Sequence, residues 1–163
     1  MLNDAIVREG KPYPPSSLHE FRISDGVAEA CELLKRSGFE LVVVTNQPDV
    51  SRGKTTIQRV EEFHEQIRLN LGIEHFYTCF HDDLDMCWCR KPQPGLILEA
   101  SRDLGIDVKK SYLVGDRWRD IDAGNSAGCK SIFVDHSFLE KQPQNYYSKV
   151  SSLLDAVPLI LGD

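Results

Sequence analysis

The chain has 163 residues and a formal net charge of −6; 41% of its residues are hydrophobic and 27% are charged. These values fit a single globular domain spanning residues 1–163, and the acidic balance argues against a broad nucleic-acid surface. The longest apolar run, residues 41–44, is too short to cross a membrane, and the first residues lack the basic and apolar segments of a signal peptide. We therefore expect a cytoplasmic, monomeric protein with reduced cysteines.

Helix and strand patterns alternate along the chain. Apolar residues at helical spacing, each run ending at a glycine, predict three helices: residues 25–38 capped by Ser24 or Asp25, 55–72 capped by Thr55 or Thr56, and 94–105 with Pro94 in the first turn. Short apolar runs predict strands over residues 41–45, 75–79, 112–114 and 131–134, with a short helix over 121–127 and a mostly helical tail over 146–161. This order predicts an α/β fold with a parallel sheet, helices on both faces, and a ligand site at the carboxyl ends of the strands.

A group of soft metal ligands follows the second predicted strand. Three cysteines and one histidine fall within eleven residues: Cys79, His81, Cys87 and Cys89. Four such ligands can close a tetrahedral zinc site, and closed sites are usually structural because no position stays open for substrate. A chance grouping and disulfides in a secreted protein are the alternatives. The expected role is to fix the loop that carries Arg90 and Lys91, and we expect the loop's acids, Asp82, Asp83 and Asp85, to be solvated.

Polar residues also follow the other predicted strands. Thr45 and Asn46 end the first strand, where a hydroxyl and an amide could bind a phosphate oxygen, although alone they would indicate only a polar strand exit. Asp116 and Asp120 follow the strand at 112–114, and two acids four residues apart can ligate Mg²⁺ and orient its waters. Together with Lys91 these residues predict a site for a phosphate and a magnesium ion.

With these motifs the chain resembles the phosphatases of the haloacid dehalogenase (HAD) superfamily, in the heptose bisphosphate phosphatase and histidinol-phosphatase branch. The resemblance covers almost the whole chain through residues 45–53, 89–95 and 114–120 and the zinc loop. It implies a Rossmann-like, capless fold, with Thr45 and Lys91 holding the transferring phosphoryl group. It further implies that Asp116 binds Mg²⁺ with support from Asp120, and that three residues contact substrate: Asn46, Arg52 and Arg90.

The chain departs from this family at its start. The superfamily's nucleophile and acid/base form an Asp-x-Asp-Gly motif at the end of a central strand, and Met1-Leu2-Asn3 matches only the residues after that motif. We therefore expect the first central strand to be missing and the 163 residues alone to show no appreciable turnover. A miscalled start codon and a truncated gene are the two explanations, and the codons upstream of Met1 distinguish them.

The leading hypothesis is a Mg²⁺-dependent phosphomonoester hydrolase with a structural Zn²⁺, acting on a small phosphorylated sugar. The expected substrate is D-glycero-D-manno-heptose 1,7-bisphosphate, which would lose its 7-phosphate. Histidinol phosphate is the alternative substrate, and a non-catalytic, zinc-stabilised phosphate-binding module is the alternative class. The partner is a small metabolite, with no nucleic acid or membrane. We expect packing or surface roles for the remaining histidines and cysteines: Cys31, Cys129, His19, His64, His75 and His136.

Overall fold

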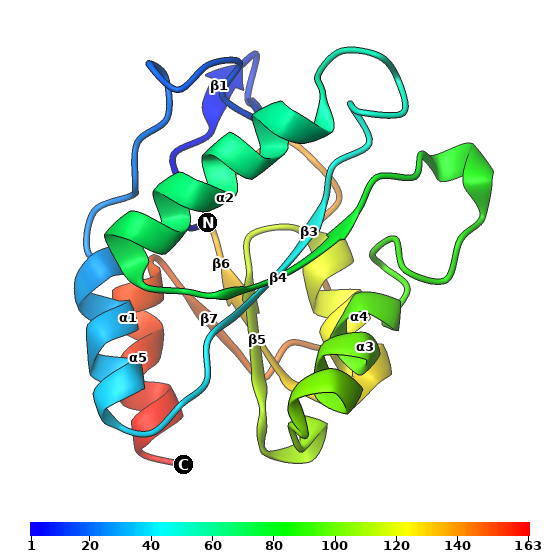
Figure 1. The fold of residues 1–163 in the computed structure, drawn as a ribbon. Coiled ribbons are helices and arrows are strands. Elements are labelled where there is room, and N and C mark those ends of the chain that lie inside the picture. The colour runs from blue at the N-terminus through cyan, green and yellow to red at the C-terminus, as the bar shows by residue number, and fades with distance from the viewer.

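The computed structural model describes residues 1–163, in which strands and helices alternate along most of the chain (Figure 1). The strands are β1 (Ile6–Arg8), β2 (Lys11–Tyr13), β3 (Val42–Asn46), β4 (His75–Cys79), β5 (Tyr112–Gly115), β6 (Lys130–Val134) and β7 (Ser148–Val150). The helices are α1 (Val27–Arg36), α2 (Ile57–Leu71), α3 (Gly95–Leu104), α4 (Trp118–Ala127) and α5 (Leu153–Leu161), with short 3₁₀ turns at Asp83–Asp85 and Val108–Lys110.

The long strands pair in parallel, as the alternating pattern predicts. β3 pairs with β4, and β5, β6 and β7 form a second parallel sheet in that order. β1 and β2 form a separate antiparallel hairpin, which lies at the top of the molecule in Figure 1. Leu139, in the loop after β6, donates its backbone N–H to the carbonyl of Gly10 in this hairpin at 2.8 Å. The hairpin therefore sits at the end of the molecule where the parallel strands finish.

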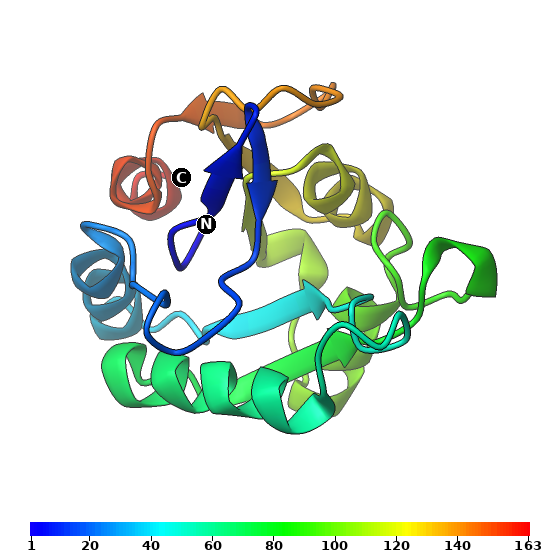
Figure 2. The same ribbon diagram turned by 90° about the horizontal axis from the view of Figure 1, so that it is seen from above.

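Helices cover both faces of the strands (Figure 2). α1, α2 and α5 contribute most of a cluster of 13 buried residues, in which Ala30, Ile132 and Ala156 have no exposed surface. α3 and α4 pack on the other side in a smaller cluster formed by Ile97, Ala123 and Ala127. Burial of apolar side chains on both faces explains why the strands are continuous apolar runs with little polar alternation.

The parallel strands form two separate sheets, because β3 and β5 do not hydrogen-bond to each other. Val43 of β3 and Val114 of β5 both pack against the large cluster, so side chains join the two sheets. Met1 and Leu2 pack against the same cluster, and the N-terminus lies in the middle of the molecule in Figures 1 and 2. The two sheets therefore share one core although their strands are not paired.

Several boundaries differ from the sequence-based expectations. α1 is capped by Gly26 in the left-handed conformation, with no side-chain cap from Ser24 or Asp25, whereas Thr56 caps α2 by accepting from the N–H of Arg59. α4 begins at Trp118, earlier than predicted. The tail over residues 146–161 is mostly helical, as predicted, because α5 takes up residues 153–161, but residues 148–150 form a strand that pairs with β6. The β1–β2 hairpin was not predicted, since strands of three residues carry too little pattern.

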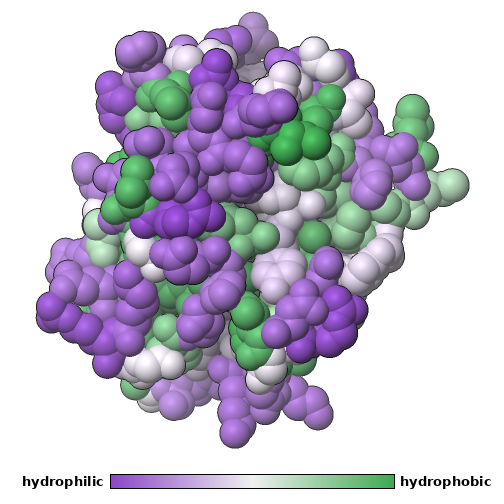
Figure 3. Space-filling view, viewed as in Figure 1, coloured by the Kyte–Doolittle hydropathy of each residue, from purple (hydrophilic) through white to green (hydrophobic).

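No helix is long and apolar enough to cross a membrane. The face seen in Figure 3 is mostly hydrophilic, with apolar residues scattered over it and gathered on the loop that projects at the right. The exposed apolar residues of the loop between β4 and α3 are Leu84, Met86 and Trp88.

His64 is the one histidine buried in the core. Its side chain stacks on Phe76, with ring centroids 4.6 Å apart, and only 3% of the residue is exposed. Nδ1 lies 3.4 Å from a carboxylate oxygen of Glu61, but neither ring nitrogen has a hydrogen-bond partner. Burial lowers the pKa of His64, and Glu61 only partly opposes this shift. The folded protein therefore keeps this imidazole neutral.

We predict that His64 makes the protein less stable at acidic pH. The unfolded chain binds a proton below about pH 6.5, whereas the folded chain binds it only at lower pH. The free energy of unfolding therefore falls as pH drops through that value, by at most about 1.4 kcal/mol per pH unit from this residue. Urea unfolding at pH 7.5 and pH 5.5 measures the loss, which His64→Leu reduces. The control His19→Leu, at an exposed side chain, leaves it unchanged; an equal loss in the His64→Leu protein would contradict the prediction.

Candidate functional site

Lys91 connects the ends of the two parallel sheets. Its Nζ donates to the backbone carbonyl of Val44 in β3 at 2.7 Å and lies 2.6 Å from Oδ1 of Asp120 in α4. The Lys91 side chain is 12% exposed, so this ion pair is largely shielded from water. The ammonium group is therefore fixed where β3 and β5 finish, on the same edge as Asp116 and Asp120.

Asn46, the last residue of β3, positions the backbone of Lys91. Its side-chain Nδ2 donates to the carbonyl of Lys91, and the N–H of Lys91 donates to Asn46 Oδ1, both at 3.0 Å. An amide side chain can make this two-way pair because it carries both a donor and an acceptor. Asn46, expected to contact substrate, thus has both ends of its amide engaged in fixing the loop that carries Lys91.

Thr45 precedes Asn46 on the same strand. Its Oγ1 accepts a hydrogen bond from Nε2 of Gln47 at 3.2 Å. The N–H of Gln47 donates to the carbonyl of Cys79 at 2.7 Å, which joins the β3 exit to the start of the zinc loop. A hydroxyl can donate one hydrogen bond while it accepts another, so the Thr45 hydroxyl can still donate a hydrogen bond to a phosphate oxygen.

Asp116 follows β5 directly and is mostly buried. Its Oδ2 lies 2.8 Å from the terminal ammonium of Met1 and 4.0 Å from Nε2 of His136. Burial on its own raises the pKa of Asp116, but Met1, His136 and Lys91 together hold that pKa below its usual range. The carboxylate is therefore ionised and sits where positive charge gathers.

Asp120 has two structural contacts. It accepts a hydrogen bond from the backbone N–H of Arg117 at 3.0 Å and pairs with Lys91. Gly115 lets this carboxylate approach β5, because a Cβ at that position would lie 2.3 Å from Cβ of Asp120. These contacts suit a residue that orients Lys91 and the start of α4.

The four predicted zinc ligands come together in one cluster. The ligand atoms of Cys79, His81, Cys87 and Cys89 all lie within 4.8 Å of one another. Cys89 Sγ is 3.2 Å from Cys79 Sγ and 3.4 Å from Cys87 Sγ, and His81 Nδ1 is 3.3 Å from Cys89 Sγ. Tetrahedral zinc with Zn–S bonds of about 2.3 Å requires S–S separations of roughly 3.8 Å. The cluster is therefore close to the size of a zinc site.

Charge explains why this cluster favours a cation. Burial, and then the nearby Cys79 and Cys87 thiols, raise the pKa of Cys89 to about 12. Burial also acts to raise the pKa of Cys87, but hydrogen bonds with Cys89 and the N–H of Arg90 bring it to about 7. Three thiolates this close repel one another, and a bound divalent cation relieves that repulsion.

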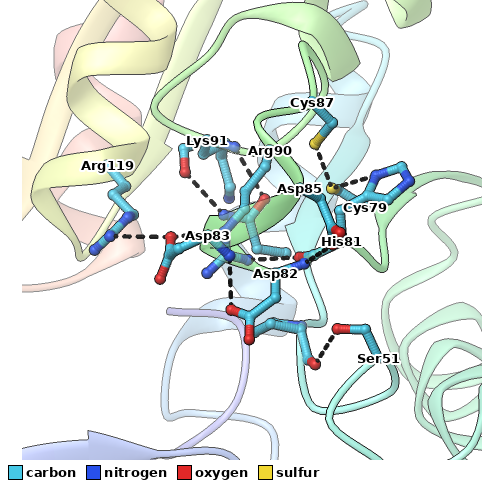
Figure 4. A network of polar contacts seen from close by, with 12 residues as sticks. Ser51, Cys79, His81, Asp82, Asp83, Asp85, Cys87, Arg90, Lys91 and Arg119 are labelled. Atoms are coloured by element: carbon cyan, nitrogen blue, oxygen red, sulfur yellow. Dashed lines mark hydrogen bonds and ion pairs between the residues drawn. The ribbon is translucent and has the colours of Figure 1, made fainter.

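Arginines contact two acids of the zinc loop, Asp82 and Asp83 (Figure 4). Asp83 and Asp85 are exposed, as expected from the sequence, whereas the Asp82 side chain is only 28% exposed. Arg52 Nε donates to Asp82 Oδ2 at 2.7 Å, and its Nη2 contacts Asp82 Oδ1. This paired contact, with the N–H of Asp83, lowers the pKa of Asp82 to about 2. Arg90 Nε lies 2.9 Å from Asp83 Oδ1. Arg52 and Arg90, both expected to contact substrate, are therefore engaged with acids of the zinc loop.

A pocket of roughly 240 Å³ opens beside this network. Its lining includes four charged residues, Asp82, Asp83, Arg90 and Lys91. A second, smaller pocket is lined by Asp116, Trp118 and His136. Lys91 and Asp116 thus line two different pockets on the surface.

Sequence reasoning missed His136, Arg119 and Asp83. His136 was assigned a surface or packing role, but it lies beside Asp116. Its position just after β6, at the same end as the other strand exits, was the signal that could have found it. Arg119 Nη2 lies 3.4 Å from Asp83 Oδ1. No sequence spacing links these two residues, because they are 36 positions apart and meet only in the fold.

The chain is similar in sequence to a family model and to curated proteins. The family model described as HAD-hydrolase-like matches residues 88–150. The D-glycero-β-D-manno-heptose-1,7-bisphosphate 7-phosphatase of Yersinia pestis is 36% identical over 122 residues, or 68% of this chain and 65% of that protein. The enzyme of the same name from Helicobacter pylori strain J99 is 31% identical over 134 residues, covering 78% of this chain and 76% of that protein. The chain thus spans just under two thirds of the first relative and about three quarters of the second.

Solved structures show the same fold. The crystal structure of D,D-heptose 1,7-bisphosphate phosphatase from B. bronchiseptica, complexed with magnesium and phosphate, matches with a TM-score of 0.81 and 24% identity. The match covers 90% of this chain and 88% of that one. A putative HAD-like phosphatase from Mesorhizobium loti matches with a TM-score of 0.71 and 23% identity over 98% of this chain and 80% of that one. The chain belongs to the haloacid dehalogenase superfamily of phosphatases, in the branch of the heptose bisphosphate phosphatases.

Proposed function

We propose that this protein is a Mg²⁺-dependent phosphomonoester hydrolase that acts on a small phosphorylated sugar. The observation that carries the proposal is the position of Lys91 Nζ between the end of β3 and Asp120, on the same edge as Asp116. An ammonium group beside an ionised carboxylate suits a phosphate with its metal ion. The relatives' names support D-glycero-D-manno-heptose 1,7-bisphosphate as the substrate, with loss of its 7-phosphate.

In this proposal Thr45 and Lys91 bind the phosphoryl group. Lys91 supplies a point charge to the phosphoryl oxygens, and the Thr45 hydroxyl supplies a hydrogen bond. Lys91 needs no large movement, because Asn46 fixes its backbone and Asp120 fixes its ammonium group. A group held in place before the substrate arrives loses little entropy on binding.

Asp116 fits a magnesium ligand, with Asp120 in support. Its carboxylate is mostly buried, and neighbouring positive charges keep its pKa below the usual range, so it is ionised. Asp120, held by Lys91 and the N–H of Arg117, orients the loop that presents Asp116. When bound, Mg²⁺ offsets negative charge on the phosphoryl oxygens.

We further propose that Cys79, His81, Cys87 and Cys89 bind a structural zinc ion. The support is the tetrahedron-sized cluster of three sulfur atoms and one ring nitrogen. Cys89 directly precedes Arg90 and Lys91, so the metal fixes the loop that carries both basic residues. All five cysteines are free, which suits a reducing compartment such as the cytoplasm.

A specific observation favours a second candidate function. The carboxylates beside Lys91 are Asp116 and Asp120, and both already contact a cation, so neither is placed to attack phosphorus. The second candidate is therefore a module that binds phosphorylated ligands without hydrolysing them. Release of inorganic phosphate from heptose 1,7-bisphosphate or histidinol phosphate by a chain extended upstream through an Asp-x-Asp-Gly motif supports the hydrolase. Binding without release by that longer chain supports the module.

Zinc analysis tests the metal site. We predict about one zinc ion per chain, and a lower melting temperature after treatment with a chelator, because ligation couples metal binding to folding. Cys87→Ser loses zinc and lowers the melting temperature. The matched control Cys129→Ala, at a cysteine outside the cluster, keeps its zinc. Protein prepared without chelators that contained no zinc would rule out the site.

Phosphate titration tests the role of Lys91. We predict that Lys91→Met weakens binding of inorganic phosphate, measured by calorimetry with Mg²⁺ present, by roughly 10- to 100-fold, because one hydrogen bond to a charged group is lost. The control Lys110→Met removes an exposed lysine away from the site and binds phosphate normally. If Lys91→Met binds inorganic phosphate as tightly as the unsubstituted protein, with its fold intact by circular dichroism, Lys91 does not bind the phosphate.

A further inference from the structure

The tip of the zinc loop carries a carboxylate that contacts three arginines. Asp83 Oδ1 lies 2.9 Å from Arg90 Nε and 3.4 Å from Arg119 Nη2 (Figure 4), and Asp83 Oδ2 lies 3.9 Å from Nη2 of Arg52, which is itself paired with Asp82. Arg90 belongs to the same loop, whereas Arg119 belongs to α4. Asp83 therefore holds together two guanidinium groups from separate elements, and Asp83 and Arg90 line the pocket that also contains Lys91.

Both guanidinium groups are fixed by contacts other than Asp83. Arg90 Nη1 donates to the carbonyl of His81 at 3.1 Å, and the Arg90 side chain is only 11% exposed. Arg119 stacks on the ring of Trp118, with 4.5 Å between its Cζ and the ring centroid. These contacts would keep both guanidinium groups in their present positions if the Asp83 side chain moved away.

Asp83 itself is free to move. Its side chain is 56% exposed, so rotating it into solvent costs little. Asp82 differs, because Arg52 contacts both of its oxygens and its side chain is only 28% exposed. Arg119 is also incompletely satisfied, since its Nε is buried and has no hydrogen-bond partner. The Arg90–Asp83–Arg119 group thus consists of two fixed cations and one movable anion.

We propose that Asp83 is a built-in counter-anion that sets how strongly the site prefers doubly charged ligands. Its carboxylate occupies Arg90 and Arg119 in the free protein, and the second anionic group of a bisphosphate displaces it. The phosphate bound by Lys91 is not affected by this exchange. Asp83 is therefore a specificity-determining residue, and Arg119 is the contact through which it acts. The inference rests on the proposed function, because it requires one phosphate to occupy the site at Lys91.

The ratio of two affinities tests the proposal. Calorimetry with Mg²⁺ gives the dissociation constants of heptose 1,7-bisphosphate and of inorganic phosphate for the full chain and for Asp83→Asn. We expect Asp83→Asn to bind the bisphosphate about 3- to 10-fold more tightly, because two partly exposed ion pairs no longer compete. Its affinity for inorganic phosphate stays the same. Asp103→Asn, which removes the same charge from α3, changes neither constant.

A double-mutant cycle assigns the effect to Arg119. Arg119→Gln weakens binding of the bisphosphate but not of inorganic phosphate. In the protein that carries both Asp83→Asn and Arg119→Gln, most of the gain from Asp83→Asn disappears. A purely structural role for Asp83 would change both affinities together, and zinc content measured on each variant reports whether the loop is intact.

The outcomes separate this inference from the proposed function. If the unsubstituted chain binds neither ligand, the proposed function is wrong and this inference is overturned with it. If inorganic phosphate binds but Asp83→Asn leaves the affinity for the bisphosphate unchanged or weakens it, only the counter-anion role is overturned. If Asp83→Asn loses zinc, the Arg119→Gln variant tests the counter-anion role by itself. Unchanged bisphosphate affinity in the Arg119→Gln protein overturns that role.

Discussion

The site depends on one ion pair, between Lys91 and Asp120. The two parallel sheets share no backbone hydrogen bond, and the ammonium group of Lys91 joins them by contacting the carbonyl of Val44 and the carboxylate of Asp120. Both side chains of the pair are only 12% exposed, so removing either partner would leave the other charge shielded from water and unpaired. The same contact that joins the sheets therefore fixes the charge proposed to bind phosphate.

The zinc loop extends this arrangement toward the ligand. Cys89 immediately precedes Arg90 and Lys91, so a metal held at the cluster restrains both basic residues from one side while Asn46 restrains Lys91 from the other. The arginines then reach acids of the same loop, which neutralises most of the local charge in the free protein. In this account the loop both stabilises the site and adjusts its affinity for anions.

The sequence was most informative where metal-ligating or charged residues directly follow a predicted strand. The clustering of the three cysteines and His81, and the position of Lys91 and Asp116 at the ends of strands, could be predicted because their residue types are unusual and follow apolar strands. The β1–β2 hairpin and β7 could not, because strands of three residues have no clear period and form only through pairing. The Asp83–Arg119 contact and the proximity of His136 to Asp116 depend on tertiary packing, which no local spacing reveals.

A crystal structure of the zinc-loaded protein with Mg²⁺ and phosphate tests the central claim most directly. The account predicts a phosphate oxygen within about 3 Å of Lys91 Nζ and of Thr45 Oγ1, and a magnesium ion at about 2.1 Å from an oxygen of Asp116. Phosphate bound elsewhere, with Lys91 still paired only to Asp120 and Val44, would contradict the account.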